Sequence, residues 1–215
     1  MDQVTVDCNL CGSELMTLVC EDKRRSFWLC GECGLVSVPG RYWLSVDDER
    51  ARYDLHDNNI SNDGYVKFLT QTANVVGATA LGRPSMRVLD FGCGENAVLC
   101  QLLNNIGIDC HGYDPLYQQS LSDINTYNII VLCEVIEHLR DINAELELIN
   151  TLLHNGGIII IRTQIYDAPS SFPSWWYAQD MTHINFFNMR SLQKLAAITN
   201  KQLISTDHSD IFILK

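Results

Sequence analysis

The segment from residue 88 to residue 97 constrains the fold of this chain more than any other. An apolar strand is predicted to end at Phe91, a Gly92-Cys93-Gly94 turn follows, and a helix is predicted from Ala97. A strand that turns through glycines into a helix brings bare backbone amides against a nucleotide-like ligand. The segment therefore predicts an α/β domain that binds such a ligand at the end of this strand.

Two acidic residues accompany the turn. Asp90 lies two residues before the first glycine, and Asp114 lies twenty-four residues after Asp90, at the end of the next predicted strand. A carboxylate at that place can accept hydrogen bonds from the two hydroxyls of a ribose. Gly92, Gly94 and Ala97 also satisfy the GxGxxA pattern of dinucleotide-binding proteins, so the turn alone does not separate NAD from other adenosine cofactors.

Predicted strands alternate with predicted helices from residue 64 onward, which indicates a mostly parallel sheet. The strands are residues 86–91, 109–113, 127–133 and 158–161, and the helices are residues 64–80, 97–105, 142–153 and 189–199. Asn155-Gly156-Gly157 is typical of a helix end, and Asn188 is a plausible N-cap. Two last strands, residues 202–206 and 211–214, predict a closing antiparallel hairpin.

Three phrases of the sequence together resemble class I S-adenosylmethionine-dependent methyltransferases. They are Val88-Leu89-Asp90-Phe91-Gly92-Cys93-Gly94, Glu134-Val135-Ile136-Glu137-His138-Leu139 and Asp180-Met181-Thr182-His183-Ile184-Asn185-Phe186-Phe187. The resemblance covers roughly residues 60–215. It implies a Rossmann-like, mostly parallel sheet of the seven-stranded type with a closing antiparallel hairpin, and S-adenosylmethionine as the cofactor.

The resemblance also implies which residues bind the cofactor. They are Asp90, Phe91, Gly92, Cys93, Gly94, Asp114, Pro115 and Glu134. The family often has a third glycine where this chain has Asn96, a residue that tolerates left-handed backbone better than most. We therefore expect Asn96 to be the one irregular position of the cofactor turn.

Four of the nine cysteines form two CxxC pairs before residue 40. Cys8 and Cys11 form the first pair and Cys30 and Cys33 the second, with eighteen residues between the pairs. This spacing predicts a zinc ribbon, in which four thiolates bind one tetrahedral ion. The ribbon, followed by residues 52–59, also resembles a zinc-ribbon subgroup of these methyltransferases, which extends the resemblance to the whole chain.

The ribbon can either recognise a macromolecule or replace a core that forty residues cannot build, and the structural role is favoured. Lys23-Arg24-Arg25 lies between the two pairs and is expected to cap a solvated hairpin rather than to bind phosphates. Pro39-Gly40 marks the end of the ribbon. The predicted units are a zinc ribbon at 1–40, a connector or lid at 41–63 and a methyltransferase domain at 64–215.

Residues 173–183 follow a buried strand and are rich in aromatic and ionisable groups, as expected of a loop that holds the acceptor. His183 is expected to titrate near neutral pH and to remove a proton from the acceptor, with Asp180 orienting its ring and Tyr177 adding a hydrogen bond. A purely structural histidine is the alternative.

His138 is the fourth predicted catalytic residue. Four positions separate it from Glu134, so the two side chains are expected to share a helix face at the edge of the sheet where ligands bind. A helix-capping hydrogen bond is the alternative for His138. Tyr53, His56 and Asn58 lie where these enzymes often have a lid, and an ordinary polar connector is the alternative for them.

The composition limits the partners. The formal charge of -11 and a pI near 4.8 make nucleic acid an unlikely partner. No apolar run approaches the roughly 20 residues that cross a bilayer, and nothing at the N-terminus resembles a secretory signal, so the cytoplasm is expected. The acceptor is therefore expected to be a small molecule or a carrier-bound metabolite.

Three alternatives stay open at this point. The chain could methylate RNA or protein and use the ribbon for recognition, it could bind the cofactor without turnover, or it could use a nicotinamide cofactor. The sequence does not specify the acceptor, the methylated atom or the oligomeric state.

Overall fold

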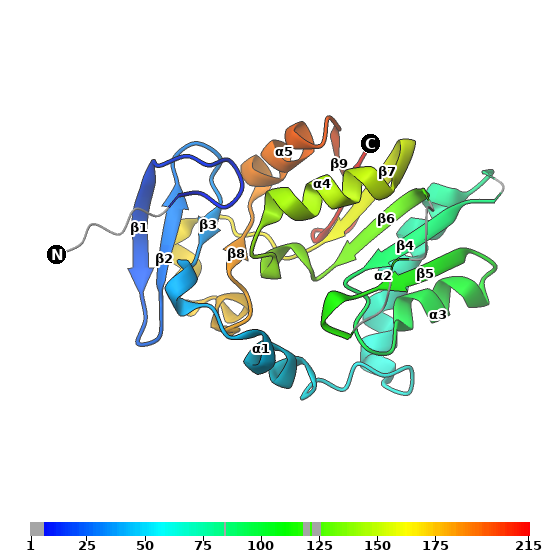
Figure 1. Ribbon diagram of the computed structural model, residues 1–215, viewed down its shortest axis with the longest axis horizontal. Coiled ribbons are helices and arrows are strands. Elements are labelled where there is room, and N and C mark those ends of the chain that lie inside the picture. The colour runs from blue at the N-terminus through cyan, green and yellow to red at the C-terminus, as the bar shows by residue number, and fades with distance from the viewer. Residues whose placement is uncertain (1–6, 84, 118–120, 122–125) are drawn as a thin grey trace.

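The central sheet of the computed structural model has six strands in the order β5-β4-β6-β7-β10-β9 (Figure 1). The structure describes residues 7–83, 85–117, 121 and 126–215. The strands are β4 (Arg87–Phe91), β5 (Asp109–Tyr113), β6 (Tyr127–Cys133), β7 (Leu153–Arg162), β9 (Leu203–Ser205) and β10 (Ile211–Leu214). The described residues thus form one strand fewer than the expected seven-stranded type.

The pairing of these strands confirms the predicted topology. β5, β4, β6 and β7 are parallel, and β10 runs antiparallel to both β7 and β9, which gives the closing hairpin. The chain leaves β4 toward β5 and then returns to β6 on the other side of β4. Ligands of open α/β sheets bind where the strand order reverses in this way. The carboxyl ends of β4 and β6 therefore mark the expected binding crevice.

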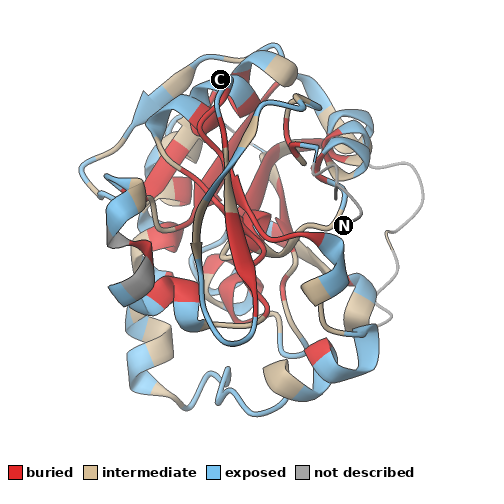
Figure 2. Ribbon diagram, turned by 90° about the vertical axis from the view of Figure 1, so that its left-hand side faces the viewer, coloured by how far each residue is buried: buried red, intermediate tan, exposed pale blue. Residues whose placement is uncertain are grey.

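Helices cover both faces of this sheet. α2 (Asp63–Ala80) and α3 (Val98–Asn105) share one apolar core with the strands, and α4 (Ile142–Leu152) and α5 (Met189–Ile198) share the other. β6 contributes alternate side chains to the two cores, which is why its sequence is an almost unbroken apolar run. Figure 2 shows the buried strands at the centre of the molecule. No helix in the described part of the chain could span a bilayer.

β7 is longer than the sequence indicates. It begins at Leu153, directly after α4, instead of at Ile158. Asn155-Gly156-Gly157, predicted to end the helix, instead lies inside the strand, where the pairing of β6 with β7 shifts register between Tyr127 and Ile129. The first residues of the strand are mostly exposed, so their sequence carries no apolar pattern that would mark a strand.

The N-terminal cysteine pairs lie next to a second, antiparallel sheet of order β1-β2-β3-β8. β1 (Met16–Glu21), β2 (Ser26–Cys30) and β3 (Val36–Ser37) come from the predicted ribbon, but β8 (Asn185–Phe186) comes from the far end of the chain. Val36 pairs with Phe186 and Ser37 with Asn185. The ribbon sheet is thus completed by a strand from the predicted 64–215 unit.

Side chains of the ribbon also share an apolar core with the loop between β7 and β8. Phe27 of β2 lies 5.7 Å, between ring centroids, from both Phe172 and Phe186. The loop itself contains two short 3₁₀ helices, η4 (Pro169–Ser174) and η5 (Trp176–Gln179), and Tyr177 of η5 belongs to the same core. The ribbon and this loop therefore stabilise each other.

The connector contains a helix that the sequence analysis missed. α1 (Val46–Tyr53) has Ser45 as its N-cap, whose hydroxyl oxygen accepts a hydrogen bond from the Asp48 amide at 3.1 Å. Three acidic residues in its first turn interact favourably with the helix dipole. Its polar sequence has no apolar face, so hydrophobic periodicity gives no signal for it. The remaining 3₁₀ segments are η1 (Gly40–Tyr42), η2 (Pro115–Tyr117) and η3 (Ile136–His138).

Arg25, predicted to lie at a solvated hairpin tip, is instead buried at 2% exposure. Its guanidinium donates to the backbone carbonyls of Ala178, Asp180 and His183 at 2.6–2.7 Å, and more weakly to that of Met181 at 3.4 Å. The same group lies 5.0 Å from the centroid of the Phe27 ring. Burial lowers the pKa of Arg25 to about 10, which still leaves it charged at neutral pH.

Replacing Arg25 by methionine tests this contact. The substitution keeps an apolar side chain in place but leaves buried carbonyl oxygens without donors, so we expect the free energy of unfolding to fall by about 3 kcal/mol or more. Urea titration of the wild type and the variant measures the difference. Arg24→Met is the matched control, because Arg24 is exposed; equal effects of the two substitutions would contradict the role given to Arg25.

Candidate functional site

The glycine turn after β4 requires glycine at its first position. Gly92 has a φ of 79°, and a Cβ there would lie 2.5 Å from Cγ2 of Val135. The amides of Gly92 and Cys93 both donate to the carbonyl of Tyr113, which ties the turn to the end of β5. Gly94 also has a positive φ, and a Cβ there would meet open space. The turn thus leaves room in front of Gly94 for a ligand to approach the backbone.

The residue with left-handed backbone at the start of α3 is Ala97, with a φ of 43°, and not Asn96. The expectation for Asn96 was therefore wrong. The Asn96 side chain instead donates to the carbonyl of Asn58 at 3.0 Å, while the backbone carbonyl of Asn96 accepts from the Gln101 side chain at 2.7 Å. At this position the chain therefore has a side chain that binds the connector.

Asp114 stands directly after β5 and faces the turn. Its two carboxylate oxygens accept hydrogen bonds from the amides of Gly94 at 2.9 Å and Leu116 at 3.0 Å. A carboxylate has about four acceptor positions, so two are left for a ligand. Burial raises the pKa of Asp114, although these two amides oppose the shift.

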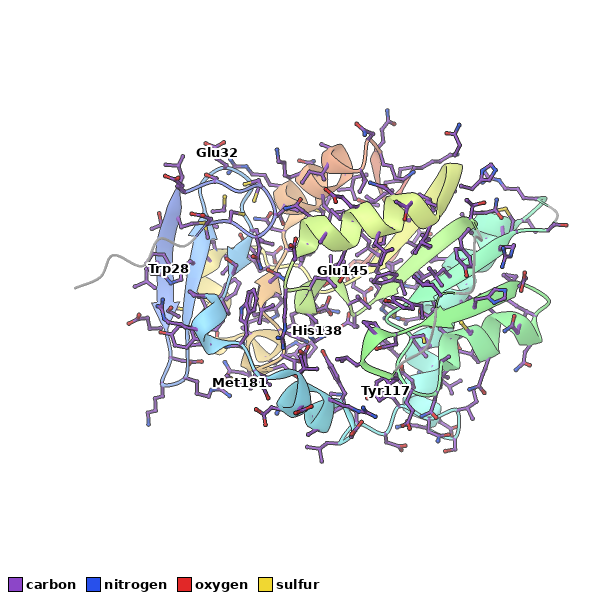
Figure 3. The ribbon with its side chains drawn as sticks, in the orientation of Figure 1. Trp28, Glu32, Tyr117, His138, Glu145 and Met181 are labelled. Carbon is purple, nitrogen blue, oxygen red and sulfur yellow. The ribbon has the colours of Figure 1, made fainter. Side chains whose placement is uncertain are left out.

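One pocket of about 750 Å³ joins most of the predicted cofactor residues. Seven of the eight line it: Phe91, Gly92, Cys93, Gly94, Asp114, Pro115 and Glu134. Asp90 does not line it and is buried behind the turn at 3% exposure. The same pocket is lined by His138, Asp180 and His183, so it connects the cofactor turn with the predicted acceptor loop. In the view of Figure 3, His138 lies above α1, and Tyr117, another lining residue, lies to the right of α1.

The chain reverses sharply at Glu134, after β6. Glu134 has a φ of 55°, which is strained for a residue with a side chain, and its amide donates to the Arg162 carbonyl at 2.8 Å. η3 follows and is only three residues long. Glu134 and His138 therefore do not share a helix face, contrary to the sequence prediction. Burial raises the pKa of Glu134 to about 7, and its Oε1 is buried without a hydrogen-bond partner among the described residues.

His138 and His183 come together at the pocket wall, with ring centroids 4.8 Å apart. Nδ1 of His138 lies 3.0 Å from the carbonyl oxygen of Thr182, and Nδ1 of His183 lies 2.8 Å from that of Tyr177. Burial lowers the pKa of His138 to about 3 and that of His183 to about 4. Both rings are therefore neutral at pH 7, and the prediction that His183 titrates near neutral pH was wrong.

Asp180 and Tyr177 make other contacts than the sequence analysis predicted. The Asp180 carboxylate accepts from Nε of Arg52 at 2.9 Å and from the amide and hydroxyl of Thr182, so it fixes the loop and α1 rather than the His183 ring. Burial alone would raise the pKa of Asp180, but the bonds from Thr182 and Arg52 outweigh it and lower that pKa. Tyr177 reaches His183 through its backbone carbonyl.

Glu137 is a buried residue of the site. The sequence placed it in a family motif but predicted no role for it. Its two oxygens accept hydrogen bonds from the Tyr177 hydroxyl at 2.5 Å and the Thr163 hydroxyl at 3.2 Å. Burial raises its pKa well above the usual value. Its place in the sequence, beside His138 at the end of a strand, is the signal that could have identified it. Tyr65 and Phe68 of α2 also line the pocket, and no motif in the sequence marked them as residues of the site.

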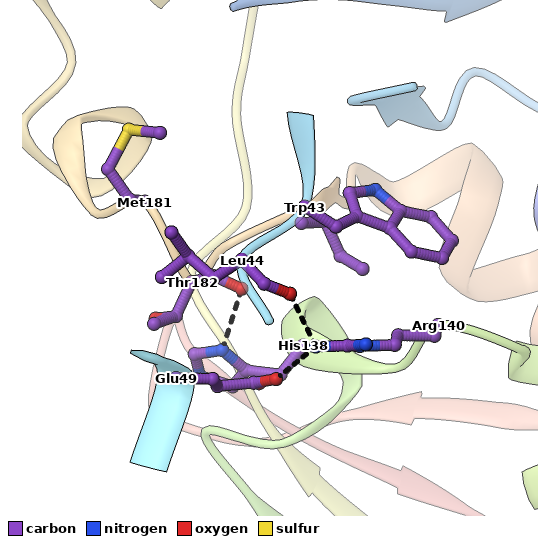
Figure 4. A pocket seen from close by; sticks show the side chains of 8 residues that line it. Trp43, Leu44, Glu49, His138, Arg140, Met181 and Thr182 are labelled. Carbon is purple, nitrogen blue, oxygen red and sulfur yellow. Dashed lines mark hydrogen bonds and ion pairs between the residues drawn. The ribbon is translucent and has the colours of Figure 1, made fainter. Parts of the chain in front are cut away.

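The connector borders the pocket. Tyr53, His56 and Asn58, predicted as a lid, all line it, and the Tyr53 ring packs against His138 with centroids 5.4 Å apart. Figure 4 shows how Arg140 anchors α1 beside His138, since its guanidinium donates to Glu49 at 2.7 Å and to a neighbouring carbonyl at 2.8 Å. The connector thus packs against the His138 side of the pocket.

The four paired cysteines converge at the other end of the ribbon sheet. The Sγ atoms of Cys8 and Cys33 are 3.5 Å apart, those of Cys11 and Cys30 are 3.6 Å apart, and all four lie within 4.8 Å of one another. Bonds of 2.3 Å to a tetrahedral zinc ion would place sulfurs about 3.8 Å apart. The cluster is therefore geometrically compatible with one zinc ion.

The strand order and the pocket define an α/β protein that binds a nucleotide-like ligand at the carboxyl ends of β4 and β6. A family model described as a methyltransferase domain matches residues 65–206. The chain therefore belongs to this methyltransferase family, and its fold is that of the class I S-adenosylmethionine-dependent methyltransferases.

Solved structures share this fold at low sequence identity. Magnesium protoporphyrin IX methyltransferase from Synechocystis PCC 6803 with bound SAH has a TM-score of 0.50 and 15% identity, over 81% of this chain and 95% of that chain. An O-methyltransferase family protein from Burkholderia thailandensis has a TM-score of 0.55 and 12% identity, over 78% of this chain and 61% of that chain. A protein from Pyrococcus horikoshii OT3 has a TM-score of 0.54 and 11% identity, over 76% of this chain and 96% of that chain. A search of curated proteins finds no match.

Because of Asp90, the stability of the folded protein is expected to depend on pH. Burial, followed by the nearby Asp114 charge, raises the pKa of Asp90 to about 7 from an unfolded value of 3.8. Its contribution to stability is therefore complete below pH 3.8 and is lost as the pH rises through 7. Relative to Asp90→Asn, we expect the wild type to lose about 3 kcal/mol between pH 4 and pH 7. Unfolding curves at several pH values measure this, and parallel stability profiles of the two proteins would contradict it.

Proposed function

We propose that this chain transfers the methyl group of S-adenosylmethionine to a small-molecule or carrier-bound acceptor. The observation that carries this proposal is the single pocket that has the cofactor turn at one end and the paired histidines at the other. A volume of about 750 Å³ is within the range of pockets that enclose drug-sized ligands. A module that only bound the cofactor would need no second, histidine-lined half.

The residues of the cofactor half fit the proposed donor. Gly94 leaves its side of the turn open, and Asp114 keeps acceptor positions for the ribose hydroxyls. S-Adenosylmethionine supplies a methyl group already activated on a sulfonium when it is bound, so the protein mainly has to align donor and acceptor. SAH is present in the Synechocystis structure of similar fold, which supports the same cofactor here.

The acceptor half provides the remaining chemistry. The neutral rings of His138 and His183 can each accept a hydrogen bond or a proton at Nε2 from a hydroxyl, amine or thiol. Asp180 holds the loop that carries His183, and Tyr177 holds the His183 ring. Tyr53 on the connector packs edge-on against the His138 ring. We assign catalytic roles to the two histidines and positioning roles to Asp180 and Tyr177.

We also propose that Cys8, Cys11, Cys30 and Cys33 hold one zinc ion with a structural role. The four thiols would fill a tetrahedral shell and leave no open position for a substrate. Burial of Arg25 removes one of the three basic groups that RNA could have used. No disulfide joins the cysteines of the described residues, as suits the reducing cytoplasm where we place the protein.

Calorimetry with S-adenosylmethionine, S-adenosylhomocysteine and NAD tests the cofactor. We expect both S-adenosylmethionine and S-adenosylhomocysteine to bind. Asp114→Ala should weaken S-adenosylhomocysteine binding at least about tenfold, because a buried carboxylate that accepts ribose hydrogen bonds is lost. Asp109→Ala is the matched control, since Asp109 lies exposed on the same strand. Binding of NAD without response to the other two ligands would overturn the proposal.

A further inference from the structure

Glu137, His138 and His183 form a cluster at the wall of the pocket that the methyl-transfer proposal does not explain. Each offers one ligand atom, and the three atoms lie within 4.8 Å of one another. Nε2 of His138 is 3.9 Å from Oε1 of Glu137. We propose that these three side chains bind a divalent first-row transition-metal ion, distinct from the ion of the cysteine cluster.

The hydrogen bonds of the two rings decide where their lone pairs point. A carbonyl oxygen can only accept, so Nδ1 of His138 donates to Thr182 and Nδ1 of His183 donates to Tyr177. In the neutral ring Nε2 then carries the lone pair. The three side chains place one possible ligand atom each within 4.8 Å of the others, and Nε2 of His138 lies 3.9 Å from Oε1 of Glu137. Neighbouring hydrogen-bond acceptors repel one another. A cation between them removes the repulsion.

The groups behind the cluster are those that support metal ligands in proteins. Metal-binding histidines usually donate their second N–H to a backbone carbonyl or carboxylate, as both rings do here. The Tyr177 and Thr163 hydroxyls donate to Glu137 and hold its carboxylate in place. Oε1 of Glu134, at the same end of β6, is buried and has no partner among the described residues.

The chemistry of the donors indicates the kind of metal. Two imidazoles and one carboxylate suit zinc, iron, cobalt or manganese, whereas magnesium and calcium prefer oxygen ligands alone. Three ligands leave at least one coordination position of the metal open. Because His138 and His183 line the pocket, that position faces the acceptor half.

The open coordination position also indicates which class of acceptor the site takes. This inference rests on the proposed methyl transfer. A hydroxyl bound to a divalent metal loses its proton more readily, so the site favours an acceptor with an oxygen nucleophile. The hydroxyl releases its proton to water, and its oxygen forms a bond with the methyl carbon of the donor. The electron pair of the breaking carbon–sulfur bond stays on sulfur. His183 then serves as a metal ligand rather than as a free base.

Zinc stoichiometry of the full chain tests the metal site. The protein is loaded with zinc sulfate, excess ions are removed by gel filtration, and the metal content is measured by mass spectrometry. We expect about two zinc ions per chain in the wild type and about one in His138→Asn and in His183→Asn. Asparagine keeps an amide donor for each backbone carbonyl, which preserves the fold. His111→Ala, at an exposed histidine on β5, is the control and is expected to keep both ions.

The outcomes separate this proposal from the methyl-transfer proposal. Circular dichroism spectroscopy verifies that each variant is folded, independently of cofactor binding. A second zinc ion that depends on both histidines supports the metal site even if neither S-adenosylmethionine nor S-adenosylhomocysteine binds. A single zinc ion in the wild type, or a second one that survives in both histidine variants, overturns it.

Discussion

The buried guanidinium of Arg25 is the interaction on which the arrangement of this molecule depends. A charge that leaves water must be matched by hydrogen bonds, and here the backbone carbonyls of one loop provide them. That loop carries Asp180 and His183. An element near the N-terminus therefore fixes the backbone beside the pocket, although more than 150 residues separate the two along the chain.

Several contacts around Arg25 make the ribbon and the pocket one unit. β8 begins two residues after His183 and completes the ribbon sheet, while the amide of Ile184 donates to the carbonyl of Glu137 at 2.9 Å. The loop is thus held by the ribbon on one side and by the end of β6 on the other. A zinc ion at the four cysteines would act on the reaction through this scaffold, at a distance from the reacting atoms. This gives a physical reason for joining a ribbon to a methyltransferase.

The sequence predicted those parts of the fold that local patterns determine. Strand–turn–helix order, apolar runs and CxxC spacing identified the parallel sheet, the closing hairpin and the cysteine cluster, because each signal lies within a few residues. The partners of Arg25, Asp180 and Asn96 could not be predicted in this way, since they depend on which distant segment the fold brings near. Burial likewise lowered the pKa of His183, and a sequence does not show burial of a polar loop residue.

Hydrogen–deuterium exchange is the most direct test that the ribbon is the scaffold of the acceptor side. The measurement compares the wild type with Cys30→Ser, both with S-adenosylhomocysteine present. The scaffold role predicts faster exchange in residues 8–38 and, together with them, in residues 177–187, while residues 88–114 stay protected. Faster exchange confined to residues 8–38 would contradict it, because the loop would then hold its structure without the ribbon.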